Sequence, residues 1–410
     1  MKSAWEGICF ICERCKANVT MRKGYEIRRE SWRNSQLQRK KRTRLNRVPV
    51  TTSSRTYDVL IGHEILRDAG KHIRVVLPKA KRAFVITSAP VRKHWAGIVT
   101  DALTAEGFEV IFLEMEDGER AKNMASVEDL ALKMMAKGAD RQSIICALGG
   151  GVVGDVAGFV ASVFMRGIPV IQMPTTFLAQ VDSSIGGKTG VNLKAGKNLV
   201  GTFYQPWLVL ADPGVFSTLP EREFRSGLYE SLKCGVIRRP DLFDRMERDR
   251  QRIVERDPGL IEWLITESVR VKADVVGADE HESGERRILN FGHTIGHALE
   301  AETAYKYFLH GEAVAWGMIA VTMIAAGLQR TDSATAQRII SLCLAYAPLP
   351  KIEVNAKKTA NRVKGDKKTV HGVTHFILPR EIGKVEVAID VTDRAVVQAI
   401  EELKYLSFVG

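Results

Sequence analysis

The chain has 410 residues, of which 45% are hydrophobic, and a formal net charge of +12. This is enough for two domains with their own cores, and no uninterrupted apolar run reaches transmembrane length. Residues 1–50 hold 14 Lys and Arg against four Glu, a balance of +10, which leaves about +2 for the other 360 residues. The sequence therefore predicts a soluble, cytoplasmic protein whose folded body binds neither nucleic acid nor membranes.

Residues 1–55 are predicted to form a basic, disordered N-terminal extension, because they have no sustained apolar period. A weak nucleic-acid tail is an alternative, and Met21 is an alternative start. The apolar core "GICFI" is too short for a signal peptide. Cys9, Cys12 and Cys15 have the spacing that begins a cluster motif, but no fourth cysteine follows at a matching distance. An iron–sulfur or zinc site is therefore not favoured there.

Short apolar runs rich in β-branched residues begin after residue 56. They cover residues 82–88, 108–115, 143–148, 169–174 and 207–212. Helical stretches such as 121–138 separate them. Strands that alternate with helices predict an α/β domain with a parallel, doubly wound, Rossmann-like sheet, and we assign it to residues 56–213.

After Pro213 the pattern changes from strands to long amphipathic segments. These cover residues 219–250, 258–276, 288–303, 311–328 and 333–346, with a short strand signal in 373–388. We predict a second, mainly α-helical domain over residues 214–410.

The stretch "SIICALGGGVVGDVAGF" contains Gly149-x-Gly151-x-x-Gly154 between a predicted strand and a predicted helix. Glycines in this context let backbone N–H groups approach a phosphate at a helix N-terminus. The motif lies mid-chain, and the next strand ends in "PTT" and not in an acid for a ribose hydroxyl. A packing role in a strand–turn–helix unit is the alternative. We favour a nucleotide site that differs from the ordinary Rossmann fingerprint.

The segment "MPTTFLAQVDSSIGGKTGVNLKAGKN", residues 173–198, interrupts the apolar pattern with glycines and polar residues. Lys188 and Lys197 within it suit an anionic ligand. A merely flexible surface loop is the alternative, but flanking apolar residues are expected to hold the segment against the core. The segment is therefore a candidate binding loop.

The stretch "RILNFGHTIGHALEAE" carries His293 and His297, which share one face of a helix because they are four residues apart. Such a pair alone is commonly a packing or surface feature. His310 follows in "LHGEAVAWG", and Glu230 lies in "SGLYESLKCG". One carboxylate and two imidazoles with an open position are typical of a catalytic zinc site. The added residues favour a metal site.

Taken in order, these motifs resemble the 3-dehydroquinate synthases, a family of sugar-phosphate cyclases, from about residue 56 to near 405. The resemblance lies in "GGGVVGD", "RGIPVIQMPTTFLAQVDSSIGGKTGVN", "GKN", "FYQP", "YESLKCG", "LNFGHTIGHALE", "LHGEAVAWGM" and "DKK". It implies NAD in the α/β domain and a divalent metal, zinc or alternatively cobalt, where the two domains meet.

The reaction that the resemblance implies is a lyase reaction of the shikimate pathway, which leads to aromatic amino acids. It converts 3-deoxy-D-arabino-heptulosonate 7-phosphate to 3-dehydroquinate and phosphate. The steps are transient oxidation by NAD, β-elimination of phosphate, re-reduction and an intramolecular aldol. Two alternatives share the superfold, namely another sugar-phosphate cyclase and a metal-dependent glycerol or alcohol dehydrogenase.

The resemblance also assigns individual residues. The implied metal ligands are Glu230, His293 and His310. The implied NAD contacts are Glu119, Lys122, Gly150, Gly151, Val152, Asp155, Thr175, Thr176, Lys188 and Lys197. The implied catalytic residues are Asp182, Lys188, Lys233, Asn290 and His297. The implied substrate contacts are Arg166, Asn198, Lys272, Arg286 and one of Lys367 and Lys368.

Arg166 is expected to reach the phosphate bound by a neighbouring subunit, which implies a homodimer. Arg286 and Lys272 suit the substrate's carboxylate, and they favour dehydroquinate synthesis over the other cyclase reactions. Two positions depart from the family pattern. Ser88 stands where an Asp usually helps to recognise the adenosine ribose, and Tyr229 brings a bulky side chain beside Glu230.

Overall fold

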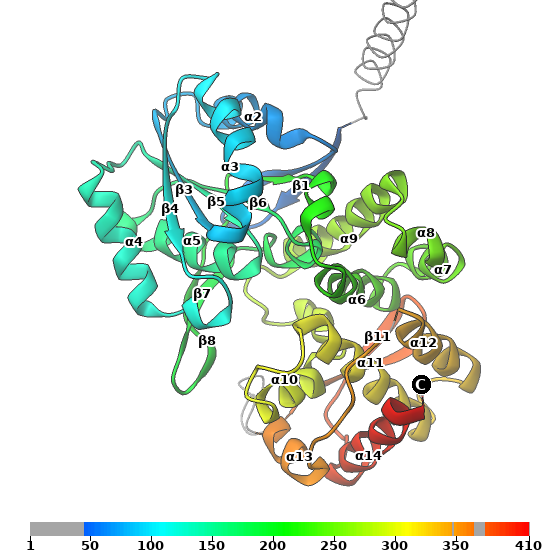
Figure 1. Ribbon diagram of the computed structural model, residues 1–410. Helices are drawn as coiled ribbons and strands as arrows, with labels where there is room; N and C mark the ends of the chain where they lie inside the picture. The colour runs from blue at the N-terminus through cyan, green and yellow to red at the C-terminus, as the bar shows by residue number, and fades with distance from the viewer. Residues whose placement is uncertain (1–44, 347, 365–373, 410) are drawn as a thin grey trace, which may run out of the picture. The chain divides into compact units, whose positions relative to one another are not determined.

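The computed structural model describes residues 45–346, 348–364 and 374–409 (Figure 1). Met21, the three N-terminal cysteines and the lysine pair Lys367 and Lys368 lie outside the described residues. Among the helices described, none combines the length and the apolar character needed to cross a membrane.

The N-terminal part is built on a seven-stranded sheet with the strand order β1-β2-β9-β6-β5-β3-β4. The pairs from β2 to β4 are all parallel, and only β1 runs antiparallel to β2. The strands are β1 (Asn46–Thr51), β2 (Thr56–Ile61), β3 (Arg82–Ser88), β4 (Glu109–Met115), β5 (Ile144–Gly149), β6 (Val170–Pro174) and β9 (Leu208–Ala211). The predicted parallel sheet and its five predicted strands are confirmed.

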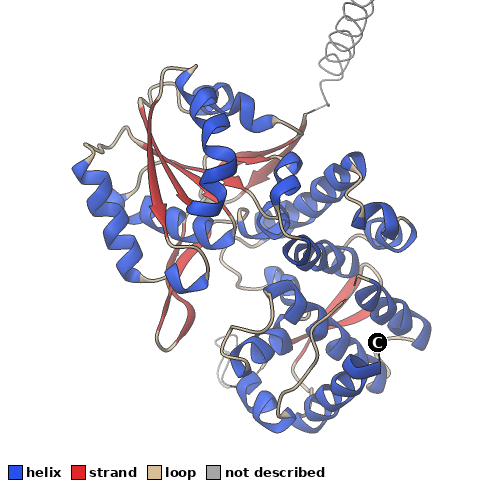
Figure 2. Ribbon diagram, viewed as in Figure 1, coloured by secondary structure: helices blue, strands red, loops and turns tan. Residues whose placement is uncertain are grey.

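Helices cover both faces of this sheet, as Figure 2 shows. They are α2 (Ala69–Val76), α3 (Ala89–Thr104), α4 (Met124–Ala136) and α5 (Gly151–Val163). Val85 of β3 belongs to the core that includes α2 and α3, whereas its neighbour Phe84 belongs to the core that includes α4 and α5. Successive strand residues point to opposite faces, so a strand buried on both sides reads as a continuous apolar run.

The extension predicted over residues 1–55 was wrong at its C-terminal end, because residues 46–51 form β1 at the edge of the sheet. Val48 and Val50 are buried and alternate with exposed residues. Pro49 is tolerated because an edge strand does not need every backbone N–H for pairing. The alternation of buried and exposed residues is short and follows a basic segment, so the sequence pattern did not predict a strand there.

The C-terminal part is mainly helical, and α11 contacts several of its other elements. Its helices are α6 (Glu221–Ile237), α7 (Pro240–Arg248), α8 (Arg250–Val254), α9 (Pro258–Ala278), α10 (His293–Glu302), α11 (His310–Gly327), α12 (Ser333–Ala345), α13 (Ala356–Lys364) and α14 (Asp393–Val409). The hairpin of β10 (Phe376–Glu381) and β11 (Lys384–Ala388) completes it. The segment predicted over 219–250 divides before Pro240, which starts α7, because proline is favoured in the first helical turn.

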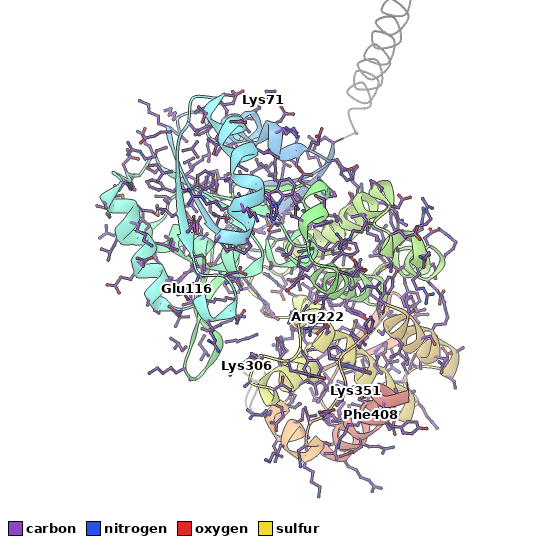
Figure 3. All side chains as sticks on the ribbon, viewed as in Figure 1. Lys71, Glu116, Arg222, Lys306, Lys351 and Phe408 are labelled. Carbon is purple, nitrogen blue, oxygen red and sulfur yellow. The ribbon has the colours of Figure 1, made fainter. Side chains whose placement is uncertain are left out.

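Side chains fill the space between these helices, and Figure 3 shows Lys351 close to Phe408 of α14. The Lys351 ammonium lies 4.7 Å from the centre of the Phe408 ring. A cation over an aromatic face adds a modest attraction at an exposed position. This contact ties α14 to the segment that precedes α13.

Glycines let α10 and α11 approach each other at backbone distance. A Cβ built on Gly317 of α11 would lie 1.8 Å from the carbonyl oxygen of Gly292 and 2.9 Å from the nitrogen of Gly296. No side chain fits there unless the two helices separate. The approach matters because α10 begins at His293 and α11 at His310.

We expect Gly317→Ala to lower the free energy of unfolding by about 3 kcal/mol, at the upper end of ordinary overpacking costs, because the obstacle is backbone. Urea denaturation measures the change. Gly327→Ala is the matched control, since nothing lies within 4 Å of a Cβ built on Gly327 in the same helix. Equal stability of the two variants would contradict the close approach.

Candidate functional site

Three helices of the C-terminal part bring a carboxylate and two imidazoles together. Oε1 of Glu230, on α6, lies 3.6 Å from Nε2 of His293 and 3.7 Å from Nε2 of His310. His297 belongs to the same cluster, because one ring nitrogen from each of the three histidines lies within 4.8 Å of the others. The predicted ligands Glu230, His293 and His310 are thus adjacent, and His297 is a further candidate donor.

The environment of Glu230 fits a cation. Its side chain is 1% exposed, and Oε1 accepts no hydrogen bond from the residues described. Oε2 lies against Nζ of Lys233, one helical turn further along α6. A buried carboxylate oxygen without a partner is costly, and a divalent metal held with the two imidazoles would satisfy it.

Backbone and side-chain acceptors orient the two predicted imidazole ligands. Nδ1 of His293 lies 3.1 Å from the carbonyl oxygen of Phe291. Nδ1 of His310 lies 3.4 Å from Oε2 of Glu300. Burial opposes protonation of His310, but the bond to Glu300 outweighs it and raises the pKa of His310. Both rings therefore present Nε2 to Glu230, as metal-binding histidines do when their other nitrogen has a partner.

Glu300 was missed by sequence reasoning. It lies on α10 seven residues after His293, so helical spacing puts both residues on one face, and this signal could have found it.

A buried group of opposite charges adjoins the metal candidate. Asp182 lies in a short π-helical segment, Ala179–Ser183, a kind of segment that is frequent at functional sites. Its Oδ1 is 2.5 Å from Nζ of Lys272 on α9 and 3.6 Å from Nζ of Lys233. Burial opposes ionisation of Asp182, yet the two ammonium groups outweigh it and lower its pKa. Three of the predicted catalytic or substrate residues thus meet beside Glu230.

The loop between α9 and α10 places another set of predicted residues. Glu282 pairs with Lys188 and accepts a hydrogen bond from Nδ2 of Asn290 at 2.7 Å. Glu282 has a φ of 59°, a left-handed conformation that is strained for a residue with a side chain. Sequence reasoning missed Glu282 because only the fold brings it to Lys188, which lies in the strand β7 (Lys188–Leu193).

Arg286 is almost completely buried, and the protein backbone holds its guanidinium. It donates to the carbonyl of Glu280 at 2.5 Å and to the carbonyl of Gly186 at 3.1 Å. Burial lowers the pKa of Arg286. Among the described residues, its Nε has no hydrogen-bond partner, so one N–H donor is left for an anion.

Two carboxylates fix the same loop. Asp279 accepts the backbone N–H groups of Ser283, Gly284 and Arg286 at 2.9, 2.7 and 3.1 Å. Burial opposes ionisation, but these bonds lower the pKa of Asp279 to about 2. Glu280 takes hydrogen bonds across the fold, from residues of the turn between β1 and β2 and from Gln205. The edge strand therefore helps to position the loop of Glu282 and Arg286.

We expect stability to fall as the pH drops from about 4.5 towards 2. Burial raises the pKa of Glu280, but hydrogen bonds from Ser53, Ser54 and Gln205 outweigh this and lower it to about 2, below the ordinary value of 4.5. A depressed pKa gives stability that is present above the unfolded-state pKa and is lost as the folded-state pKa is approached. Urea midpoints at pH 7, 4.5 and 3 measure the loss. The urea midpoint of Glu280→Gln should be lower than that of the wild type at pH 7, and it should fall less between pH 4.5 and 3. An equal fall in the two proteins would contradict this role of Glu280.

The glycine motif lies where β5 ends and α5 begins. Gly150 caps α5 without a side-chain bond, so the first N–H groups of the helix remain available to an anion. A Cβ on Gly151 would lie 3.0 Å from Oγ of Ser183, and one on Gly154 would lie 2.9 Å from Oε1 of Gln172. A Cβ on Gly150 would likewise lie 3.0 Å from Cγ2 of Thr176, so all three glycines are closely packed, and Gly150 and Gly151 also form the start of α5.

Predicted NAD contacts gather around this helix start. Lys122 pairs with Asp155 at 2.5 Å, and Glu119 accepts a hydrogen bond from Asn192 at 2.8 Å. The backbone N–H of Thr175 donates to the carbonyl of Gly149 at 2.9 Å, which joins the ends of β5 and β6. Val152 and Thr176 lie in the same strand-end region, in the first turn of α5 and just after β6.

Three further predicted positions are Arg166, Asn198 and Ser88, and the backbone N–H of Asn198 donates to Oδ1 of Asn192, the partner of Glu119, at 2.8 Å. Arg166 and Asn198 are exposed, with φ values of 70° and 51°. Neither makes a hydrogen bond to another predicted substrate residue within the described part of the chain. Ser88 ends β3 and is buried at the start of α3. The roles assigned to the individual site residues stay predictions.

Comparison with known proteins identifies the family. The model for the 3-dehydroquinate synthase N-terminal region matches residues 112–226, and the model for the C-terminal region matches residues 227–369. The 3-dehydroquinate synthase of Solibacter usitatus (strain Ellin6076) is 46% identical over 352 residues, which cover 86% of this chain and 97% of that protein. The chain belongs to the 3-dehydroquinate synthase family. The member from Gloeobacter violaceus is 42% identical over 87% of this chain and 99% of its own length.

Solved structures of several other enzymes share the fold of this chain. ValA, the 2-epi-5-epi-valiolone synthase from Streptomyces hygroscopicus subsp. jinggangensis 5008 with NAD⁺ and Zn²⁺ bound, is 30% identical with a TM-score of 0.79, over 85% of this chain and 97% of that one. A 2-deoxy-scyllo-inosose synthase complexed with carbaglucose-6-phosphate, NAD⁺ and Co²⁺ is 27% identical with a TM-score of 0.79, over 87% and 100%. Glycerol dehydrogenase from Schizosaccharomyces pombe, at 17% identity and a TM-score of 0.63 over 85% and 88%, shares the fold alone.

Proposed function

We propose that this chain converts 3-deoxy-D-arabino-heptulosonate 7-phosphate to 3-dehydroquinate and phosphate, as a lyase of the shikimate pathway. Family membership supports the proposal. The observation that carries it is Oε1 of Glu230, which accepts no hydrogen bond from the described residues and faces Nε2 of two histidines beside the buried lysines. A cation centre next to fixed ammonium groups suits a polyhydroxylated substrate with two anionic ends.

NAD and a divalent metal, zinc or alternatively cobalt, are the proposed cofactors. Two solved relatives contain NAD⁺ with Zn²⁺ or Co²⁺. Glu230, His293 and His310 would hold the metal, which when bound acidifies a coordinated hydroxyl. Gly150, Gly151 and the residues around the start of α5 would hold NAD, which when bound takes up a hydride and returns it. The donor set and the uncapped helix start fit both groups.

The remaining predicted residues have roles that their chemistry supports. Lys272 and the free Nε of Arg286 suit the substrate carboxylate. Asp182 favours the protonated form of both neighbouring lysines, although burial outweighs it at Lys272 and lowers the pKa of that group. Lys188, Asn198 and His297 suit the phosphate, and His297 is suited to relay protons because an imidazole can both donate and accept a proton.

The proposed enzyme is a homodimer. The exposure of Arg166 supports this, because an exposed cation at a strained turn is available to a second subunit. The cytoplasmic location stays a prediction.

Phosphate release tests the proposed function. Protein stripped with a chelator is supplied with zinc, NAD or both, and is given the heptulosonate phosphate. We expect release only with both additions. Sedoheptulose 7-phosphate and glucose 6-phosphate, which lack a carboxylate, serve as comparison substrates for other cyclases, and glycerol serves for the dehydrogenase alternative. Faster release from a sugar without a carboxylate, or NADH accumulation with glycerol, would contradict the proposal.

A further inference from the structure

Glu300 contacts residues from both candidate cofactor sites. Its side chain is 4% exposed and lies on α10 in the C-terminal part. Oε2 lies 3.4 Å from Nδ1 of His310, a predicted metal ligand. Oε1 lies 3.2 Å from Nζ of Lys197, a predicted NAD contact in the strand β8 (Gly196–Phe203) of the N-terminal part. One carboxylate thus touches a residue of each site.

The surroundings of Lys197 favour a defined position for its ammonium group. Nζ lies 3.8 Å from Oε1 of Glu119, another predicted NAD contact, and 4.2 Å from the centre of the Tyr305 ring. The loop after α10 brings Tyr305 there through two residues with positive φ, Ala304 at 53° and Tyr305 at 58°. Non-glycine residues adopt this conformation at a cost, so the loop is held in place by its contacts.

Figure 3 labels Lys306, which marks this loop on the side of the helical part that faces the β7–β8 hairpin of Figure 1. The backbone N–H of Tyr305 donates to the carbonyl oxygen of Glu300 at 2.8 Å. Glu300 therefore contributes its side chain to Lys197 and its backbone to the loop that covers Lys197.

We propose that Glu300 is a positioning residue that couples metal binding to NAD binding. This rests on the proposed function, since it assumes that His310 binds the metal and Lys197 contacts NAD. A bound cation fixes the His310 ring and strengthens its bond to Glu300, which then holds Lys197 in place for the cofactor. Coupling between two binding sites is reciprocal, so NAD must tighten metal binding by the same factor.

Titration calorimetry of the full chain with NAD, with and without zinc, tests the coupling. Zinc should lower the NAD dissociation constant of the wild type about tenfold, within the ordinary range of allosteric coupling. Glu300→Gln should bring this factor to within about twofold of unity, and it should weaken zinc binding about 10- to 100-fold in a chelator competition. Glu302→Gln is the control, because Glu302 ends the same helix and pairs with Arg362.

Lys197→Met provides a second test. The Lys197 side chain is 27% exposed, so this variant is less prone to misfold than one at the buried Glu300. It should remove the coupling and leave zinc affinity without NAD unchanged. Glu300→Gln added to it should not change the coupling further. The inference, but not the proposed function, would be overturned if the wild type bound zinc and NAD independently. It would also be overturned if zinc still lowered the NAD dissociation constant of the Glu300→Gln variant by the wild-type factor. A wild type that binds neither would overturn the proposed function as well.

Discussion

Glu230→Gln is expected to reduce kcat at least about a thousandfold, because metal chemistry contributes several kcal/mol of transition-state stabilisation and 1.36 kcal/mol is a factor of ten. Glutamine keeps the shape of the side chain and removes the charge that Oε1 presents to His293 and His310. Bound zinc, measured by elemental analysis after gel filtration, should fall well below one per chain.

Glu267→Gln is the matched control for this variant. Glu267 is also a buried glutamate on a helix of the C-terminal part, but it pairs with Arg239 and Arg270 and not with the site. It should keep its zinc and its turnover number. A Glu230→Gln variant that retains zinc and more than a tenth of wild-type kcat would contradict the assigned metal site.

Asp182→Asn is expected to lower the free energy of unfolding by about 3 kcal/mol. Removing one partner of a buried charge pair leaves the other charge uncompensated, and such losses are about 3–5 kcal/mol. The partial exposure of Asp182, 24%, places it at the lower end of this range. Lys272 and Lys233, which are 8% and 2% exposed, would both lose their shared partner.

Urea denaturation at pH 7 measures this loss. Asp129→Asn is the control, since Asp129 forms an exposed pair with Lys133 on α4, and such pairs contribute about 0–1 kcal/mol. Similar losses in the two variants would contradict the view that Asp182 holds the buried lysines together.

The α/β fold could be predicted because its strands are buried on both faces and read as short apolar runs. The strand β3 is an example, with Phe84 and Val85 in different cores. The edge strand β1 was missed because half of its residues are exposed and it adjoins a basic segment. The break before Pro240 was missed because one amphipathic pattern continues across two helices.

The site was predictable where spacing along one helix determines neighbours. His293 and His297 are four residues apart and lie in one cluster. Glu230 is far away in sequence, so residue chemistry and the resemblance could nominate it, but only the fold brings it beside the histidines. Glu282 and the internal bonds of Arg286 depend on how a loop meets β7 and Gly186, which no local pattern contains. Tertiary contacts of this kind need the fold itself.

Product analysis of one complete reaction tests the central claim most directly. The heptulosonate phosphate is incubated with zinc, NAD and the full chain, and the mixture is followed by proton and phosphorus NMR with absorbance at 340 nm for NADH. We expect equal amounts of carbocyclic 3-dehydroquinate and inorganic phosphate, with no net NADH. Stoichiometric NADH, or phosphate release without a carbocyclic product, would contradict the proposed function.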